Sequence, residues 1–549
     1  MKQLRKVSNR YGGEWILKKK QLLKQAAQSE ISSVKYLVEY HDCLLFLLAY
    51  PESRELFDLA ESELLRVAAI NRKYFERKNE RLQMQLAGTG MAFTPVNVAF
   101  SFDIAKWLAD RYPAYVSIME CDADNEKIKD IIRILIPKAE IDSFVKQPST
   151  LREFIKDANE YSKFSDLQWF LNSIWDKDLP CEIRDNLYDS LKIYVRWLVN
   201  ETMPSRTFAR SLPRKVFYQE IEINRHPDAK KLIQRYITDP VKISSKEKKH
   251  LLETARGMLC MLQRETDPVT YSDMKAVQFF SMEKGIDLAL YPMHFERRLP
   301  FDSYIGYMAF KNRLPIAYGG GWIFQQRSKI GVHVFEPYRG GESAFMFCQV
   351  LRLYHHHYGI NRFVVEPYQI GKNNAEGIKS GAFWFYYRLG FVPVSEKLRM
   401  LAAKEFEMIL SDKNYRSPFN MMKKLTHSNL ELVCDEAGYH STDVLHVSES
   451  VTKMINNRFE GDRKEAEVTT FRDIQKFLEI DDISSYSKEE KQSLRNFSFL
   501  LSTLTNLSEW NGSDKRKMIA LIKLKGGGSE WRYIRQFQKH TKLNAALKI

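Results

Sequence analysis

The chain has 549 residues, of which 44% are hydrophobic and 28% are charged. This is the composition of an ordinary globular protein, and the length is sufficient for two to four domains that each bury a core. The formal net charge of +15 favours acidic partners, namely phosphate-rich cofactors, nucleic acid or anionic surfaces, without choosing among them.

Six cysteines are scattered along the chain and none of them forms a CxxC pair. This pattern argues for a reducing cytoplasm and against a zinc knuckle or a disulfide framework. The basic N-terminus lacks the apolar core of a secretion signal, and the most apolar early run, Cys43 to Tyr50, is far too short to span a bilayer. We therefore expect a cytoplasmic protein with no membrane span.

Residues 14 to about 200 are predicted to be mostly helical. Glu52 to Gln85 carries apolar residues at helical spacing, and Thr150 to Glu153 has the residues of a capping box before another helix. The same spacing is expected to continue through Leu187, Leu191, Tyr194, Trp197 and Leu198. The aromatic residues in these rows are interpreted as core rather than as a ligand groove.

The central part of the chain alternates between strand and helix patterns. In order, we predict two strands of a hairpin, a third strand, a helix, a fourth strand and a second helix, at residues 304–310, 314–324, 330–335, 344–358, 363–366 and 382–389. This order is typical of a parallel α/β unit whose ligand binds at the strand ends. Ile286 to Tyr291 is our candidate for the first strand of the sheet, and Asn429 to Cys434 for its closing strand.

The first of these helices begins within Arg339-Gly340-Gly341-Glu342-Ser343. Free backbone N–H groups at a helix start, glycines that let a ligand approach and an adjacent arginine together form a site for pyrophosphate. A tight turn capped by Ser343, with no ligand, explains the same residues.

The second helix ends in Tyr386-Tyr387-Arg388-Leu389-Gly390-Phe391. Together with the order of elements, this segment resembles the GNAT superfamily of acyl-CoA-dependent N-acyltransferases, over residues 270–435 or so. That family has a Tyr-x-x-x-Gly-Phe signature at this helix and a Gln/Arg-x-x-Gly-x-Gly/Ala loop at the preceding one. Aligning Arg339 and Ala344 with the loop pattern places Glu342 where the family has its central glycine.

The resemblance implies that strands 330–335 and 363–366 diverge, and that acetyl-CoA or another acyl-CoA lies between them. The donor would bind to the backbone of Val334 and Phe335. Its diphosphate would rest on Arg339, Gly340, Gly341, Ser343 and Ala344.

The resemblance also implies catalytic roles. Glu336 and Glu366 end the two diverging strands and would take the proton of the attacking amine, and Tyr386 would protonate the departing thiolate. For Glu336, simply ending a strand before a proline is an equal alternative.

Two further motifs need an explanation. Gly319-Gly320-Gly321 lies inside a predicted strand, where a bulge is the default interpretation and the close approach of another group is the functional one. His355-His356-His357 is not expected to bind a metal, because consecutive helical residues point about 100° apart and cannot converge on one ion.

The last segment, Lys515 to Ile549, is basic and contains Trp531, Tyr533 and Phe537. Basic residues with aromatic ones are typical of surfaces that bind nucleic acid such as tRNA, or an acidic protein. A solvated charged helix is the simpler alternative.

These observations predict an α+β multidomain protein, with a helical N-terminal domain at 1–240, a GNAT-like mixed α/β domain at 245–435 and a small basic helical domain at 448–549. The predicted function is transfer of an acyl group from acyl-CoA to an amine acceptor that the sequence does not name. Two alternatives stay open. One is a transferase of the same fold that uses aminoacyl-tRNA or an acyl-carrier protein, and the other is a catalytically silent binding or scaffold protein.

Overall fold

The computed structural model of the chain describes residues 2–31, 33–77, 79–145, 150–435 and 442–547. Lys548 and Ile549, the end of the basic C-terminal segment, lie outside the described residues. The chain divides into two compact units: Met1–Glu222, Lys249–Thr270 and Asn312–Pro315 form the first, and Ile223–Lys248, Tyr271–Lys311 and Ile316–Ile549 form the second. Within the described ranges, no helix combines the length and the apolar character that crossing a membrane requires.

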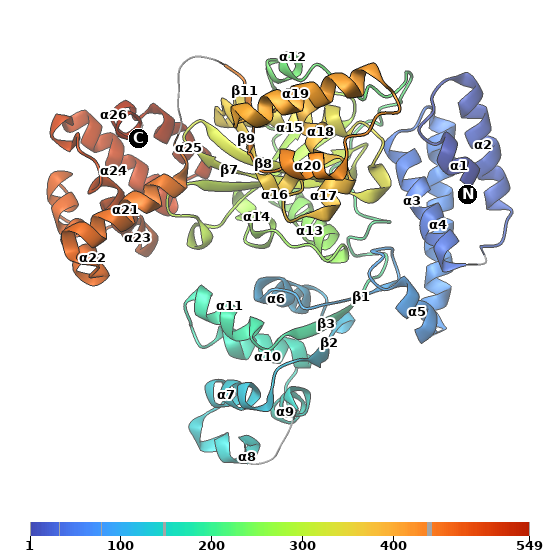
Figure 1. Ribbon diagram of the computed structural model, residues 1–549. Coiled ribbons are helices and arrows are strands. Elements are labelled where there is room, and N and C mark those ends of the chain that lie inside the picture. The colour runs from blue at the N-terminus through green and yellow to red at the C-terminus, as the bar shows by residue number, and fades with distance from the viewer. Residues whose placement is uncertain (1, 32, 78, 146–149, 436–441, 548–549) are drawn as a thin grey trace. The chain divides into compact units, whose positions relative to one another are not determined.

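The first unit begins with five helices (Figure 1). They are α1 (Lys2–Val7), α2 (Gly13–Ala27), α3 (Val34–Ala49), α4 (Arg54–Glu76) and α5 (Glu80–Leu86). Ser33 and Ser53 are the N-cap residues of α3 and α4, and the side chain of each accepts a backbone N–H of the first helical turn. The helical pattern predicted for this stretch is therefore confirmed.

The first unit also contains a small antiparallel sheet, which the sequence analysis missed. Its strands are β1 (Pro95–Val98), β2 (Val116–Cys121) and β3 (Ile193–Leu198), in the order β1-β3-β2. The helical pattern expected through Tyr194 and Trp197 is wrong, because buried and partly exposed residues alternate along β3. Over six residues, the apolar positions fit a strand as well as a helix.

Helices flank this sheet and close the first unit. They are α6 (Phe102–Arg111), α7 (Asn125–Leu135), α8 (Ile141–Val145), α9 (Leu151–Ala158), α10 (Asp166–Trp175), α11 (Cys181–Asp189), α14 (Asp267–Thr270) and, from Lys249 onward, α13 (Ser245–Met261). The capping box predicted before α9 is confirmed, because the side chains of Thr150 and Glu153 each bond the other's backbone N–H.

The second unit is built on an eight-stranded sheet with the order β10-β11-β9-β8-β7-β6-β5-β4. The strands are β4 (Gln278–Ser281), β5 (Ile286–Pro292), β6 (Ser303–Lys311), β7 (Leu314–Phe324), β8 (Arg327–Val334), β9 (Arg362–Val365), β10 (Val392–Pro393) and β11 (Leu430–Val433). β8 and β9 run parallel to each other, whereas β7 and β8 are antiparallel. Our candidate for the first strand is corrected, because β4 precedes β5 and forms the edge of the sheet.

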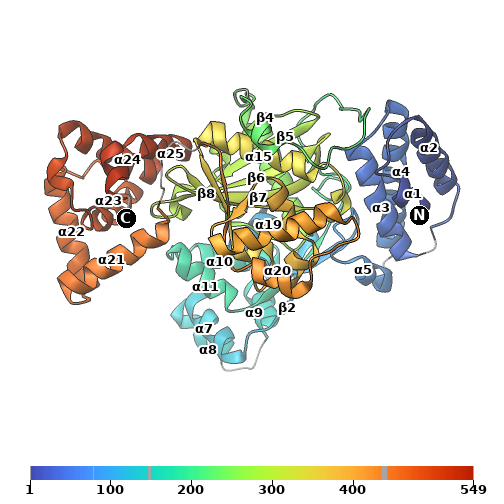
Figure 2. The same ribbon diagram turned by 45° about the horizontal axis from the view of Figure 1, so that its top comes forward.

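Helices of the second unit pack on the sheet and extend beyond it. They are α12 (Ala229–Ile233), α15 (Ser343–Tyr358), α16 (Pro367–Ile370), α17 (Ala375–Lys379), α18 (Ala382–Arg388), α19 (Glu396–Ser411), α20 (Phe419–Leu425), α21 (Val444–Phe459), α22 (Arg463–Phe477), α23 (Lys488–Leu501), α24 (Gly512–Gly527), α25 (Glu530–Lys539) and α26 (Thr541–Ala546). α15 lies against the sheet (Figure 2), and the Tyr354 hydroxyl donates to the Ile305 carbonyl at 2.7 Å. The α+β class expected from the sequence is thus present.

The glycine triad causes no bulge toward β8. β7 pairs with β8 without a shift in register from Ala317 to Phe324. A Cβ at Gly319 would lie 2.6 Å from the Tyr307 hydroxyl, and one at Gly320 would lie 2.6 Å from the Tyr304 ring. The glycines are needed because side chains of the protein itself lie directly on this strand.

The C-terminal segment is partly core. Tyr533 and Phe537 are each 2% exposed, and the Ser303 hydroxyl donates to Glu530 at 2.5 Å. Lys525 is buried and donates to Glu530 at 3.2 Å. Two of the three aromatic residues that suggested base stacking therefore pack inside the second unit, and Trp531 remains 39% exposed.

Candidate functional site

The parallel strands β8 and β9 separate early. Their pairing covers three residues and ends at Lys329 opposite Val364, although β8 continues to Val334. Phe335 donates its N–H to Ile316 of β7 at 3.0 Å. Because backbone groups alternate in direction along a strand, those of Val334 point away from β7, into the space that β9 has left.

Tyr386 of α18 reaches the same space. Its hydroxyl accepts the N–H of Val332 at 3.4 Å, and its ring packs edge-on against those of Phe347 and Phe391. Burial raises the pKa of Tyr386, so the hydroxyl stays protonated at neutral pH. Of the predicted catalytic residues, Tyr386 is the one whose side chain bonds the backbone of β8 beyond the paired residues, within the part of the chain that the structure describes.

The two predicted carboxylates lie in different surroundings. Glu366 is the N-cap residue of α16 and forms an ion pair of 3.1 Å with Lys329, the last paired residue of β8. Burial disfavours the charge of Lys329, but the hydrogen bond to Glu366 and the charges of Glu366 and Asp443 outweigh it and raise the pKa of Lys329. Glu336 is exposed in the 3-10 turn η5 (Glu336–Tyr338). Across the described residues, no hydrogen bond joins either carboxylate to Tyr386.

The turn before α15 differs from the predicted anion cradle in one respect. Glu342, rather than Ser343, is the N-cap residue, and no side chain caps the helix, so the capping alternative for Ser343 is wrong. The Glu342 carboxylate is buried and accepts bonds from Lys311 at 2.7 Å and Lys284 at 3.2 Å. The Glu342 carboxylate therefore points toward lysines on the sheet side of the turn, and it need not lie beside a phosphate.

The outer side of this turn is more open. Gly340 has a φ of 93°, and a Cβ placed there would meet no atom within 4 Å. Arg339 is exposed and lies 3.6 Å from Glu376 of α17. Phe335 uses both backbone groups inside the protein, since its carbonyl accepts the N–H of Tyr338 at 3.0 Å. Val334 is thus the predicted backbone contact that remains directed at the divergence.

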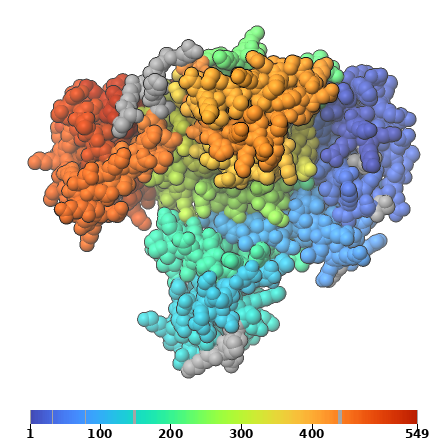
Figure 3. Space-filling model, in the orientation of Figure 1, coloured from blue at the N-terminus to red at the C-terminus, as the bar shows by residue number. Residues whose placement is uncertain are grey.

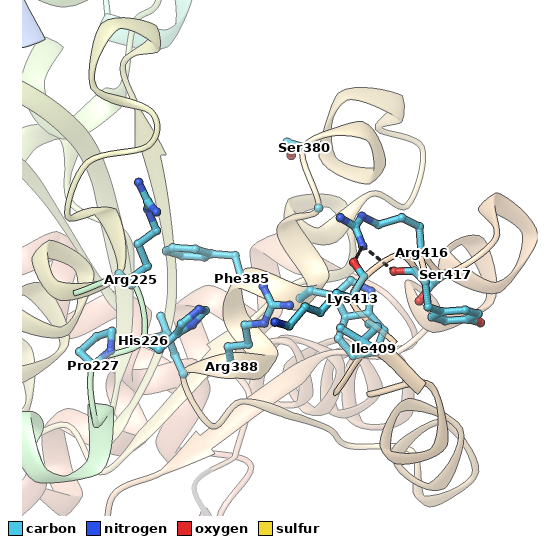
Figure 4. A pocket seen from close by; sticks show the side chains of 15 residues that line it. Arg225, His226, Pro227, Ser380, Phe385, Arg388, Ile409, Lys413, Arg416 and Ser417 are labelled. Atoms are coloured by element: carbon cyan, nitrogen blue, oxygen red, sulfur yellow. Dashed lines mark hydrogen bonds between the residues drawn. The ribbon is translucent and has the colours of Figure 1, made fainter. Parts of the chain in front are cut away.

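A pocket of about 580 Å³ opens beside the first turns of α15 and α18 (Figure 4). The side chains of Arg388 and Lys413 point toward one another in it. It is lined by Arg225, His226, Pro227, Ala344, Ser380, Gly381, Trp384, Phe385, Arg388, Leu389, Ile409, Lys413, Tyr415, Arg416 and Ser417. The lining has four cationic residues, besides His226, and no carboxylate.

Three features of this cationic pocket favour an anionic ligand. Like charges that face each other without a carboxylate repel, and an anion between them relieves that repulsion. Ala344 lies in the first turn of α15, where the helix dipole is positive. Trp384 is 8% exposed, and its indole N–H has no acceptor within the described chain. A buried donor without a partner is costly, so a ligand oxygen would satisfy it.

Most of the cationic pocket could not be found in the sequence. Arg388 belongs to the segment that carried the resemblance, and Ala344 was a predicted contact. Arg225, Lys413 and Arg416 come from distant loops with no motif of their own. Arg416 donates to the carbonyls of Lys413 and Tyr415 at 2.8 and 2.7 Å, which fixes the loop that presents Lys413.

The three consecutive histidines make separate contacts. His355 bonds the Ile360 carbonyl at 2.6 Å, His356 the Ile233 carbonyl at 2.9 Å, and His357 the Gln278 side chain at 3.0 Å. Each ring thus has a different partner. The described residues contain no group of three or more side chains placed to hold a metal ion.

The chain matches no protein-family model, no curated protein and no solved structure.

Proposed function

We propose that the second unit transfers an acyl group from acyl-CoA to an amine, as the resemblance to the GNAT superfamily implies. The observation that carries the proposal is the early end of pairing between β8 and β9, at Lys329 and Val364. Beyond it, the backbone of Val334 and the hydroxyl of Tyr386 face the space between the strands. A thioester arm placed there would have hydrogen-bond partners on one side and a proton donor on the other.

The cationic pocket supports a donor that carries several negative charges. Its volume of about 580 Å³ lies within the range of small-molecule sites, roughly 300–1,000 Å³. The phosphates of CoA would contact Arg388, Lys413 and the first turn of α15. The rings of Trp384 and Phe385 would contact the nucleoside. We propose acetyl-CoA or another acyl-CoA on this ground.

The reaction is a direct attack. The amine nitrogen forms a bond to the thioester carbon, and the C–S bond breaks when the tetrahedral intermediate collapses. The amine must first lose a proton, since a lysine-like ammonium has a pKa of about 10.4, and Glu366 or Glu336 would accept it. Tyr386 would give its proton to the thiolate, and the second proton, which the nitrogen loses as the amide forms, would return to Tyr386 through solvent, so that one proton is released in all.

Donor binding tests the proposal directly. At 100 times its dissociation constant, acetyl-CoA should add about 2.7 kcal/mol to the unfolding free energy. Arg388→Gln and Lys413→Gln should each weaken binding about ten-fold or more, because each removes a charge-assisted bond. Lys404→Gln, on the exposed surface of α19, is the matched control and should bind normally. If acetyl-CoA neither stabilises the protein nor binds in calorimetry, the acyl-CoA proposal is wrong.

The catalytic assignment needs its own test. Tyr386→Phe removes the acid and keeps the ring packing, so kcat should fall by about 10²–10⁴ while KM stays close to normal. A rate equal to that of the unchanged protein would exclude Tyr386 as the proton donor.

A second candidate keeps the fold and replaces the donor with aminoacyl-tRNA. Exposed lysines lie beyond the cationic pocket, among them Lys379, Lys404 and Lys423, on α17, α19 and α20. α19 and α20, orange in Figure 3, form a large part of one face of the second unit. Binding of tRNA that weakens steeply with salt, without any stabilisation by acetyl-CoA, would favour this candidate.

A further inference from the structure

The first unit has a pocket of its own, of about 540 Å³, that no feature of the acyl-transfer proposal uses. It lies between the end of α4, the 3-10 turn η1 (Pro113–Tyr115) and the turn at residues 200–203. It is lined by Arg72, Phe75, Glu76, Phe93, Arg111, Tyr112, Pro113, Ala114, Tyr115, Asn200, Glu201, Thr202 and Met203. We propose that this aromatic pocket binds a nucleoside monophosphate, with the phosphate at Arg111 and the base on the rings.

The two arginines are held in the same way. The Nε of Arg72 donates to Glu76 at 2.9 Å, and its guanidinium lies 5.7 Å from the centre of the Phe93 ring. The Nε of Arg111 lies 3.1 Å from Glu253, and its guanidinium is 5.6 Å from the centre of the Tyr112 ring. A guanidinium has five N–H groups in a rigid plane, so fixing Nε orients the remaining donors for a bidentate contact with phosphate.

The charges decide which end of the pocket receives the phosphate. Glu76 and Glu201 line the pocket and lie 2.9 and 3.9 Å from Arg72, so they offset its charge and would repel an anion there. Glu253, which pairs with Arg111, is not among the lining residues. Arg111 is thus paired with one carboxylate outside the lining and Arg72 with two inside it, so the less negative end of the pocket is at Arg111.

The remainder of the lining suits a flat ring. Tyr115 is 40% exposed and would present its ring to a base, whereas Phe93, whose ring centre lies 6.5 Å from that of Phe75, is 7% exposed. Bases of nucleotides stack on such side chains regardless of their identity. Burial and the charge of Glu253 raise the pKa of Tyr112 to about 12, so its hydroxyl remains a donor.

The backbone at the pocket is also unusual. Phe93 has a φ of 62°, a left-handed conformation that is rare for a bulky residue. The N–H of Phe93 donates to the Val199 carbonyl at 2.9 Å, next to the turn at 200–203. This hydrogen bond holds the strained residue in place. In that turn, Asn200 accepts both the N–H and the hydroxyl of Thr202, so its amide N–H₂ is left to donate.

The test uses the full chain and a probe that marks its own position. Because the cationic pocket could also hold a nucleotide, the background is Arg388→Gln/Lys413→Gln, and the probe is 8-azido-AMP. After irradiation, labelled peptides should come from residues 111–115 or 200–203, and AMP should prevent the labelling. Arg111→Gln should raise the dissociation constant of AMP at least ten-fold. Arg111→Lys keeps the charge and loses the bidentate fork, so an intermediate affinity is expected.

Matched arms separate the outcomes. Arg133→Gln, on an exposed turn of α7 where the arginine pairs with Asp130, should bind AMP normally. Adenosine and inorganic phosphate should each compete more weakly than AMP. The proposal is wrong if labelling avoids the first unit, or if it persists unchanged in Arg111→Gln. If phosphate competes as strongly as AMP, the aromatic rings do not contribute to binding. Because labelling is mapped by peptide, failure here is separate from failure of acyl-CoA binding in the second unit.

Discussion

The buried carboxylate of Glu342 gives the sharpest prediction for the second unit. Its side chain and that of Lys311 are both 0% exposed, and their charged atoms lie 2.7 Å apart. At an effective dielectric constant of about 20, two unit charges at that distance attract by about 6 kcal/mol. Glu342→Gln removes the negative charge and leaves the Lys311 ammonium buried.

We expect the loss of stability to be about 3 kcal/mol. Breaking a buried ion pair by removing one partner costs about 3–5 kcal/mol. Two observations favour the lower end: Lys311 keeps its hydrogen bond to the Lys284 carbonyl at 2.7 Å, and the Lys284 side chain is 29% exposed and can turn to water.

The assay must report the second unit alone, because a chain of two units need not unfold in one step. Hydrogen exchange of the α15 amides in rising urea meets this requirement. Glu449→Gln, on the exposed side of α21, should change the free energy of unfolding by less than about 0.5 kcal/mol. Lys311→Met with Glu342→Leu should recover most of the stability, because apolar pairs replace buried ion pairs well. A loss below about 1 kcal/mol in Glu342→Gln would refute the buried pair.

Two further predictions concern packing and pH. Gly319→Ala places a Cβ 2.3 Å from the Gly331 carbonyl oxygen and should lower the free energy of unfolding of the second unit by about 1–3 kcal/mol, measured by the same hydrogen exchange in urea. Gly527→Ala, whose Cβ meets no atom within 4 Å, should be neutral or slightly stabilising, and equal effects would contradict the close approach on β7. Burial lowers the pKa of His357 to about 4, below the value of about 6.5 in the unfolded chain. The contribution of the neutral ring to the free energy of unfolding is therefore present above about pH 6.5 and is lost as the pH falls toward 4. The loss of stability should approach about 3 kcal/mol. His357→Gln should remove that part of the acid sensitivity, whereas His446→Gln, at an exposed histidine, should leave the acid sensitivity unchanged.

The sequence predicts the elements around the divergence well, for a local reason. α15 ends at Gly359 with a φ of 70°, and Gly390 after α18 has a φ of 92°, which are left-handed positions that favour glycine. Short β-branched runs between such stops can only be strands. β3 lacks these stops, and its apolar positions were compatible with the helix that precedes it.

The anion cradle shows why a site is harder to predict than an element. Glu342 sits among glycines in the sequence, where a carboxylate looks as if it faces the ligand. Its actual partners, Lys311 and Lys284, are 31 and 58 residues away. No local pattern links such residues, since the pairing exists only after the sheet has formed. The orientation of one side chain therefore changed the interpretation of the whole turn.

The burial of Glu342 is compatible with an anion on the outer side of the turn before α15. Because Glu342 is neutralised by two lysines, its charge adds little repulsion toward a ligand on the other side of the backbone. The outer side keeps the open glycine Gly340, the exposed Arg339 and the first turn of α15. Glu342, which stands where the loop pattern has its central glycine, thus anchors the turn, and in the acyl-CoA proposal the positive charge facing the donor would come from Arg388 and Lys413 at the cationic pocket.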